Sequence, residues 1–243
     1  MDIAIVKYNA GNIHSVINAL GRLGVKALLT DNEEELRRAD KVIFPGVGEA
    51  STTMEYLRAH NLDRIIKDLK QPVLGICLGQ QLMCSRSEEG NAECLGIFDV
   101  PVLKFQPQKH EDKVPHMGWN TIETDGKGIF KGFEKPEYVY FVHSFYVPVC
   151  DWTAAKTDYI LPFSASLHKD NFYATQFHPE KSGEYVTKLW IKKEGVRYIF
   201  MQDIFRLPDM KLSIRAQVDS VCLVNGKLAE SPELNEKFAP FLQ

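Results

Sequence analysis

Long apolar runs are missing from this sequence of 243 residues. None reaches the ~18 residues that a membrane-spanning helix needs. Clusters of Lys and Arg are also missing and the formal net charge is −3, so neither a nucleic acid nor a membrane surface is an expected partner. Residues 1–8 carry a charge at Asp2 and no cleavage site follows, so we expect no signal peptide and a cytoplasmic protein.

Cysteine is scarce, and its spacing excludes two kinds of metal site. The five cysteines are Cys77, Cys84, Cys94, Cys150 and Cys222. They form no Cys-x-x-Cys pair and no closely spaced framework, which argues against a zinc ribbon and against an iron–sulfur site. We therefore predict reduced thiols, no metal site and no cofactor.

Short apolar runs alternate with helix-like stretches over the first 80 residues, in a chain long enough for one substantial domain. Strands are predicted at residues 2–7, 25–30, 41–44 and 72–76. Helices are predicted at residues 13–23 after Asn12 as a cap, and at 32–39, 51–60 and 62–70. Strands separated by helices indicate a mostly parallel sheet, so the fold class is α/β.

The middle of the chain, residues 94–173, has a different pattern. Short β-like runs at residues 102–105, 119–123, 138–147 and 163–167 are separated by Pro and Gly. They predict an antiparallel β-rich insertion laid over the parallel core. A further strand at residues 172–177 leads into His178.

Residues 75–79, Gly-Ile-Cys-Leu-Gly, end an apolar strand and precede a helix-like run. Small residues on both sides of Cys77 permit a tight strand-to-helix turn that exposes the sulfur, the thiol counterpart of a nucleophile elbow. The helix N-terminus beyond it favours a thiolate and can bind an oxyanion. A buried strand-end cysteine packed between glycines is the alternative, and the motif alone does not decide between them.

A nucleophile needs a base, and the base needs an orienting group. His178 and Glu180 are two residues apart on a segment expected to be extended, so their side chains would point to the same face. Glu180 could then hold the imidazole toward Cys77. A solvated pair at a strand end is the usual alternative, but the elbow upstream favours the triad.

Residues 45–48, Pro-Gly-Val-Gly, follow the third strand at the same edge of the sheet. Their glycines can present N–H groups to a substrate or an oxyanion, and a plain turn is the alternative. Residue 51 is Ser51, so this is no Gly-x-Gly-x-x-Gly dinucleotide fingerprint.

Several motifs together resemble a known family. Residues 75–81 and 177–182 resemble the class I (triad) glutamine amidotransferases. Within that class, residues 8–12, 44–48, 114–120 and 140–146 look like the glutaminase subunit of imidazole glycerol phosphate synthase. The resemblance covers roughly residues 1–185.

The resemblance implies a role for each motif. Cys77 would attack the side-chain amide of glutamine, while His178 relays the proton and Glu180 orients it. Backbone N–H groups of Leu78, Gly46 and Val47 would form the oxyanion hole. The residues expected to hold glutamine are Gly48, Gln81, His143, Ser144 and Phe145.

The resemblance also implies a partner, a cyclase subunit of (β/α)8 barrel type that receives the ammonia. It would make imidazole glycerol phosphate and aminoimidazole carboxamide ribotide in histidine biosynthesis. The residues expected to face it are Asn12, Met117, Trp119, Asn120 and Lys181. Trp119 suits an aromatic interface anchor, and a core tryptophan is the alternative.

The tail departs from the family, so the expected domains are 1–185 for the amidotransferase and 186–243 unassigned. Val186, Leu189 and Trp190 are spaced for a helix, so we expect an altered closing helix there. Beyond it, residues 197–200 and 221–224 could be strands, the latter entering an Asn225-Gly226 turn. An added module, a disordered extension and an altered end of the gene all remain open.

Two other functions remain open. A stand-alone cysteine hydrolase, similar to γ-glutamyl hydrolases or peptidases, would keep the triad and need no partner. A non-catalytic binding module on the same scaffold is disfavoured because Cys77, His178 and Glu180 are all present.

Overall fold

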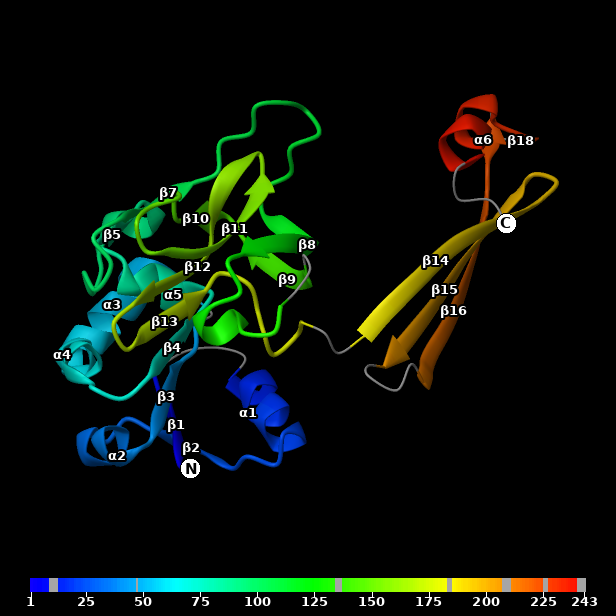
Figure 1. The fold of residues 1–243 in the computed structure, drawn as a ribbon. Coiled ribbons are helices and arrows are strands. Elements are labelled where there is room, and N and C mark those ends of the chain that lie inside the picture. Colours follow the sequence, from blue (N-terminus) through cyan, green and yellow to red (C-terminus); the bar gives the residue numbers. More distant parts are fainter. Residues whose placement is uncertain are drawn as a thin grey trace. The chain divides into compact units, whose positions relative to one another are not determined.

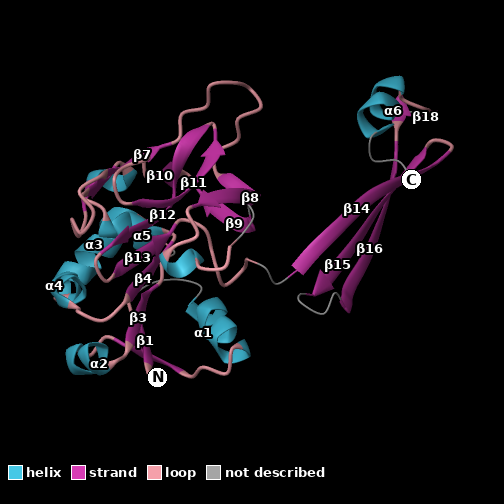
Figure 2. Ribbon diagram, viewed as in Figure 1, coloured by secondary structure: helices cyan, strands magenta, loops and turns pink. Residues whose placement is uncertain are grey.

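The computed structural model describes residues 1–8, 13–46, 48–133, 137–182, 185–206, 211–224 and 227–239. Contacts divide the chain into two units, Met1–Ser182 and Gly183–Gln243. Figure 1 labels most of the elements of both units, and Figure 2 distinguishes their helices from their strands.

Five parallel strands form one half of a nine-stranded sheet in the first unit. In spatial order they are β2 (Ala27–Thr30), β1 (Ile3–Val6), β3 (Lys41–Phe44), β4 (Val73–Ile76) and β13 (Phe172–Thr175). All four neighbouring pairs are parallel. Each strand lies within two residues of its predicted bounds, and the predicted α/β class is confirmed.

Helices cover both faces of the parallel strands, which suits strands that are apolar on both sides. Helix α1 (Ile13–Arg22) lies on one face, where Val16 packs with Ile5 and Ile43. Helices α2 (Glu33–Arg38), α3 (Ala50–Ala59) and α4 (Leu62–Asp68) lie on the other face (Figure 1). There Ala4 and Phe44 join the larger buried cluster.

Four antiparallel strands continue the same sheet beyond β13. They are β12 (Leu161–Lys169), β11 (Thr153–Tyr159), β8 (His116–Thr124) and β9 (Glu137–His143). The predicted β-rich insertion is therefore present, but it extends the sheet instead of lying over it. The sequence did not predict β11, because its residues Thr-Ala-Ala-Lys-Thr-Asp-Tyr have little apolar alternation.

A small second sheet joins segments that are far apart in the sequence. Its order is β10 (Phe145–Tyr146), β7 (Pro101–Lys104), β5 (Arg86–Ser87) and β6 (Ala92–Glu93). It brings Phe145 beside the helix α5 (Leu78–Met83) that follows β4, since Gln81 donates to the Phe145 carbonyl. In the described part of the chain, no helix is long and apolar enough to cross a membrane.

The second unit is built on a three-stranded antiparallel sheet of β14 (Tyr185–Glu194), β15 (Arg197–Arg206) and β16 (Lys211–Val221). A hairpin, β17 (Leu223–Val224) and β18 (Lys227–Leu228), and helix α6 (Pro232–Phe238) follow. The ring of Tyr198 in β15 packs edge-on against Phe238 of α6. The expected Asn225-Gly226 turn lies outside the described residues.

The expected closing helix is wrong, because residues 185–194 form strand β14 and pair with all ten residues of β15. The helical spacing of Val186, Leu189 and Trp190 competes with a run rich in β-branched and aromatic residues. Such residues favour strands when a partner strand is available. The predicted strand at 197–200 falls inside β15, while residues 221–224 span the end of β16 and all of β17.

Candidate active site

Cys77 occupies a sharp turn between β4 and α5. Its backbone has φ 54° and ψ −107°, a left-handed conformation that is unfavourable for a residue with a side chain. Its N–H donates to the carbonyl of Thr175 at 2.7 Å, which ties the turn to β13. The sulfur therefore lies at the carboxyl edge of the parallel sheet, where the elbow motif places it. The predicted exposure is not found, because Cys77 is buried, with only 8% of its surface exposed.

Glycines permit this turn by letting two backbone segments touch. A Cβ on Gly79 would lie 2.2 Å from the carbonyl oxygen of Phe44, and one on Gly46 would lie 2.2 Å from the nitrogen of Gly79. Both distances are far below any real Cβ contact, so only glycine fits. The end of β3 is thereby pressed against the start of α5, next to Cys77.

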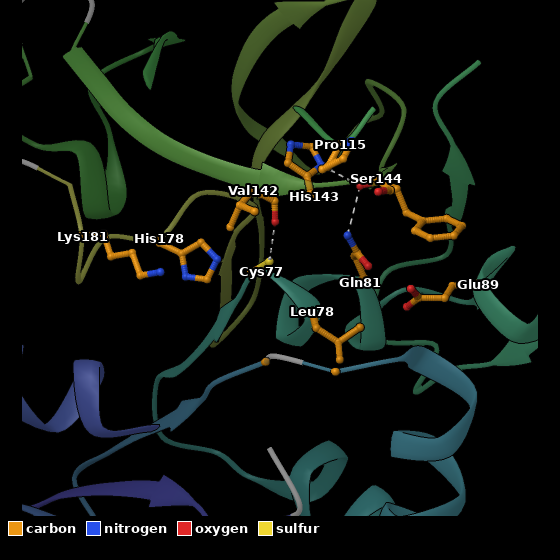
Figure 3. A pocket seen from close by; sticks show the side chains of 13 residues that line it. Cys77, Leu78, Gln81, Glu89, Pro115, Val142, His143, Ser144, His178 and Lys181 are labelled. Carbon is orange, nitrogen blue, oxygen red and sulfur yellow. Dashed lines mark hydrogen bonds between the residues drawn. The ribbon is translucent and has the colours of Figure 1, made fainter. Parts of the chain in front are cut away.

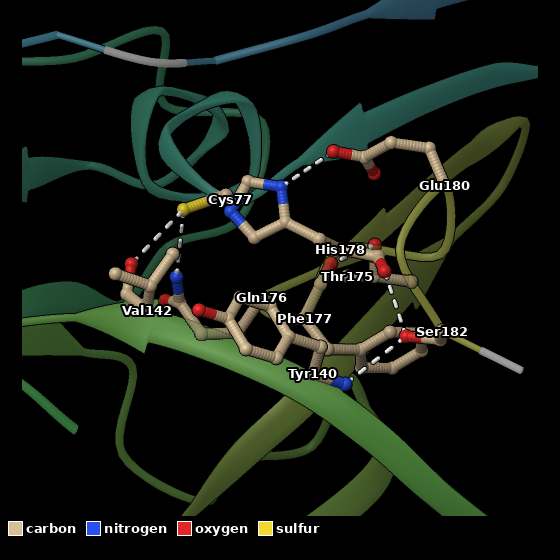
Figure 4. A network of polar contacts seen from close by, with 9 residues as sticks. All are labelled: Cys77, Tyr140, Val142, Thr175, Gln176, Phe177, His178, Glu180 and Ser182. Carbon is tan, nitrogen blue, oxygen red and sulfur yellow. Dashed lines mark hydrogen bonds and ion pairs between the residues drawn. The ribbon is translucent and has the colours of Figure 1, made fainter. Parts of the chain in front are cut away.

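His178 and Glu180 form a buried pair with 2.7 Å between Nδ1 and Oε1 (Figure 4). The side chain of His178 is 4% exposed and that of Glu180 is 5% exposed. The expectation of an extended segment is wrong, since β13 ends at Thr175 and Glu180 lies in a turn. Ser182 holds that turn, because its hydroxyl donates to the His178 carbonyl at 2.7 Å and accepts from the Tyr140 N–H at 3.0 Å.

The ionisation of His178 is shifted by its partners. Burial lowers the pKa of His178, but side-chain hydrogen bonds with Cys77 and Glu180 and the negative charges of both outweigh it and raise the pKa to about 9. A base that lies beside the thiol and is held by a carboxylate can take the proton of the thiol. The predicted triad residues thus lie together.

A cavity of about 360 Å³ opens beside the sulfur (Figure 3). Ten of the predicted site residues line it: Gly46, Gly48, Cys77, Leu78, Gln81, His143, Ser144, Phe145, His178 and Lys181. Val47 lies outside the described residues. Three further lining residues, Glu89, Pro115 and Val142, were not predicted.

The polar side chains of the cavity wall are bonded to one another. Gln81 Nε2 donates to the carbonyl of Phe145 at 3.1 Å and to Oε1 of Gln176 at 3.0 Å. His143 Nδ1 lies 2.7 Å from the same carbonyl and its Nε2 lies 3.2 Å from Nδ1 of His116. Burial lowers the pKa of His143 to about 3, helped by the charges of His116 and His178 and opposed by the bond to Phe145, so this ring is neutral.

Glu89 supplies a carboxylate to the cavity wall. Its Oε2 accepts from the Ala50 N–H at 2.9 Å, at the start of α3. Burial raises the pKa of Glu89, the Ala50 bond opposes this, and the charge of Glu49 adds to it. Across the described residues, no group of three or more His, Cys, Asp or Glu is placed to hold a metal ion.

The residues expected to face a partner lie mainly on the β8–β9 hairpin. Met117 is 64% exposed and Trp119 is 44% exposed, so Trp119 is not a core residue. Trp119 packs edge-on against Tyr140, whose ring also has Lys181 Nζ at 5.5 Å. Asn120 donates to the Asp158 carbonyl at 2.9 Å, and Asn12 lies outside the described residues.

The fold, with a thiol at the strand edge beside a buried His–Glu pair, is that of a class I glutamine amidotransferase. Residues 4–197 match the family "Glutamine amidotransferase class-I", and the chain belongs to this family. The match confirms the predicted family and the predicted enzyme class.

Two relatives indicate which member of this family the chain resembles. The chain is 70% identical over 184 residues to imidazole glycerol phosphate synthase subunit HisH of Bacteroides thetaiotaomicron, covering 76% of this chain and 94% of the relative. It is 43% identical over 191 residues to the subunit of the same name from Escherichia coli K12, covering 78% and 96%. The predicted resemblance to the glutaminase subunit of that synthase is confirmed.

Two solved structures share the fold. A crystal structure of a glutamine amidotransferase matches with a TM-score of 0.57 at 18% identity, over 73% of this chain and 90% of that one. A glutamine amidotransferase from Thermotoga maritima matches with a TM-score of 0.51 at 15% identity, over 74% and 76%. At these identities the likeness concerns the fold alone.

Proposed function

We propose that this chain is the glutaminase subunit of an imidazole glycerol phosphate synthase and works in the cytoplasm. It hydrolyses glutamine and passes the ammonia to a cyclase subunit of (β/α)8 barrel type. That cyclase makes imidazole glycerol phosphate and aminoimidazole carboxamide ribotide in histidine biosynthesis. The observation that carries the proposal is the buried, hydrogen-bonded His178–Glu180 pair, with both Cys77 and His178 in the lining of one cavity.

The chemistry follows from the positions of these three groups. His178 takes the proton of the Cys77 thiol as the sulfur attacks the carboxamide carbon of glutamine, and a C–S bond forms. His178 then gives that proton to the amide nitrogen, and ammonia leaves as the C–N bond breaks. Water, deprotonated by His178, attacks the resulting thioester. Glutamate is released and the thiol is restored.

The oxyanion formed in each attack needs N–H donors. Leu78 begins α5 directly after Cys77, and the first N–H groups of a helix have no partner within it. The N–H groups of residues 46 and 47 would supply the second donor, because Gly46 packs against the start of α5. Removal of one such donor typically costs ~10²–10³ in rate.

The cavity suits an amino acid with two charged ends. Glu89 is the acidic side chain of the described lining and would pair with the α-ammonium group. Lys181 adds a positively charged side chain to the same lining. Gln81 and the segment His143–Phe145 would hold the rest of the glutamine.

The exposed face of the β8–β9 hairpin supports the partner assignment. Met117 pairs with Val142 and Trp119 pairs with Tyr140 across the hairpin, so these four side chains share a face. Val142 lines the cavity, while Met117 and Trp119 are exposed. A barrel that covers this face would reach the place where ammonia forms.

The test is glutamate release from glutamine by the full chain, with and without a purified cyclase and its nucleotide, with Cys77→Ala as control. We expect release that needs the partner and disappears in the variant. Equal release without the partner would support a stand-alone cysteine hydrolase instead. Release that persists in Cys77→Ala, or none in any mixture, would contradict the proposal.

A further inference from the structure

Gln176 is a buried polar residue that the triad chemistry leaves without a role. It follows the last residue of β13, its side chain is inaccessible to solvent, and its N–H donates to the Ala165 carbonyl at 2.8 Å. Its Nε2 lies 3.6 Å from the sulfur of Cys77 (Figure 4). A glutamine amide buried beside a nucleophile is either a packing element or a donor to the sulfur.

Gln81 decides which end of the Gln176 amide faces Cys77. Gln81 Nε2 donates to Gln176 Oε1 at 3.0 Å, so the oxygen of Gln176 is taken by a donor and its NH2 group points to the sulfur. Gln81 itself is fixed by a second bond, to the carbonyl of Phe145 at 3.1 Å. The orientation of Gln176 therefore follows from its neighbours.

The other contacts of the Cys77 sulfur indicate when the Gln176 amide matters most, which is after the thiol has lost its proton. The Cys77 thiol donates to the Val142 carbonyl at 3.9 Å, a bond that a thiolate cannot make. The Gln176 NH2 group can only donate, so its bond strengthens when the sulfur is an anion. His178, whose ring lies beside Cys77, takes the proton (Figure 4). Loss of the proton thus removes the bond to Val142 and strengthens the bond from Gln176.

We propose that Gln176 is a positioning residue for Cys77: its amide donates to the thiolate and fixes the position of the sulfur beside the cavity, and Gln81 orients that amide. Gln81 lines the cavity while Gln176 does not, so a ligand that contacts Gln81 acts on the sulfur through Gln176. The role in glutamine hydrolysis rests on the proposed function. The contact with the sulfur does not.

Alkylation of Cys77 by iodoacetamide tests the proposal without glutamine. In the full chain, the rate is followed between pH 5 and 10 by mass spectrometry of the Cys77 peptide. We expect Gln176→Met to react about tenfold more slowly at pH 7 and the midpoint of its rate profile to move to higher pH, since bonds to charged groups have effects of about this size.

Gln80→Met is the matched control. Gln80 is equally buried, but its Nε2 donates to the Ser164 carbonyl at 3.2 Å, and the hydrogen bonds of the Cys77 sulfur go to Val142 and Gln176 instead. We expect its alkylation profile to follow the unmodified chain. A Gln176→Met profile that matches the unmodified chain, or an equal slowing in Gln80→Met, would overturn the proposal.

Gln176→Glu keeps the assay decisive if Gln176→Met does not fold. The carboxylate keeps an acceptor for Gln81 and has no donor for the sulfur, so alkylation should slow at least as much; an unchanged rate would overturn the proposal. In glutaminase assays with the cyclase, kcat should fall about tenfold while KM stays within about twofold. If the unmodified chain releases no glutamate, the proposed function fails, but alkylation still decides the role of Gln176.

Discussion

At the scale of single residues, the site depends on a cysteine held in an unfavourable conformation. A left-handed backbone costs about 1–3 kcal/mol for a residue other than glycine. At Cys77 the 2.7 Å bond to Thr175 and the close contact of Gly46 with Gly79 offset that cost. The backbone thus presents the sulfur to the cavity, where His178 also lines the wall and the amide of Gln176 lies 3.6 Å from the sulfur.

The raised pKa of His178 makes stability depend on pH. A folded-state pKa of about 9, above the ordinary 6.5, contributes stability that is fully present below pH 6.5 and lost as pH rises through 9. We expect the free energy of unfolding in urea to fall by ~2–3 kcal/mol from pH 6.5 to 9.5. In Glu180→Gln the pKa of His178 falls and the decline over this range becomes smaller. Parallel declines in both proteins would refute this origin.

Glu89→Gln should weaken binding of glutamine rather than chemistry. The amide keeps a carbonyl acceptor for the Ala50 N–H but has no charge for an α-ammonium group. We expect KM to rise about tenfold or more with kcat little changed in the presence of the cyclase. Glu93→Gln is the control, because Glu93 is exposed and outside the cavity lining. A fall in kcat at constant KM would argue against this role.

Site residues that belong to a short sequence motif could be predicted from the sequence. Site residues that only the three-dimensional fold brings to the cavity or to the sulfur could not. Cys77 lies between two glycines at a strand end, and His178 lies two residues from Glu180. Glu89 comes from a short 3-10 turn, Glu89–Asn91, that no pattern marks. Gln176 had one usable signal, an uncharged polar residue at the end of an apolar strand.

At the scale of elements, the elbow is a joint between β3, β4 and α5 that leaves no room for a side chain. We expect Gly79→Ala to destabilise the first unit by about 2–3 kcal/mol, because its Cβ would meet the backbone carbonyl of Phe44, which cannot move aside. Gly21→Ala is the control. Gly21 lies in α1 with no atom within 4 Å of its Cβ position, so alanine should stabilise slightly. Urea unfolding of both variants measures the contrast.

The β8–β9 hairpin is the element on which partner binding depends. We expect Trp119→Ala to weaken cyclase binding about tenfold or more, or to release ammonia to solvent, with little effect on unfolding, since Trp119 is 44% exposed. Calorimetric titration and the ratio of ammonia to cyclase product measure these effects. Leu28→Ala, at an exposed position of β2, should change neither. Normal binding together with normal coupling in Trp119→Ala would contradict the interface assignment.

Helices and strands could be predicted where nearly all of their residues share one environment, such as the buried core. The inner parallel strands β1, β3 and β4 are largely buried and consist of continuous apolar runs such as residues 42–44. Strand β11 is half-buried and carries several polar residues. Its strand conformation is explained only by its pairing with β12 and β8. Strand β14 carries a helical spacing that pairing with β15 overrides. Local sequence patterns carry no information about pairing between distant segments, so strands that depend on such pairing could not be predicted.

At the scale of the whole molecule, the site is assembled within one of the two units. The thiol comes from the β4–α5 turn, the base from the segment after β13, and the cavity wall from β9 and the small sheet. All three large buried clusters of the described chain draw their members from residues 3–177. Ile191, Tyr198 and Ile199 are buried in the second unit, where Tyr198 packs against α6.

A chain that ends at Ser182 should therefore keep the site. Its buried clusters and every described residue of the cavity lining are retained, so we expect iodoacetamide to alkylate Cys77 at pH 7 within about twofold of the full chain. Glutamate release in the presence of the cyclase should also stay within about twofold of that of the full chain. The family match runs to residue 197, so a chain ending at Glu194 tests whether β14 matters. Alkylation slowed tenfold in both chains would show that residues 195–243 support the site, and slowing only in the shorter one would assign that support to residues 183–194.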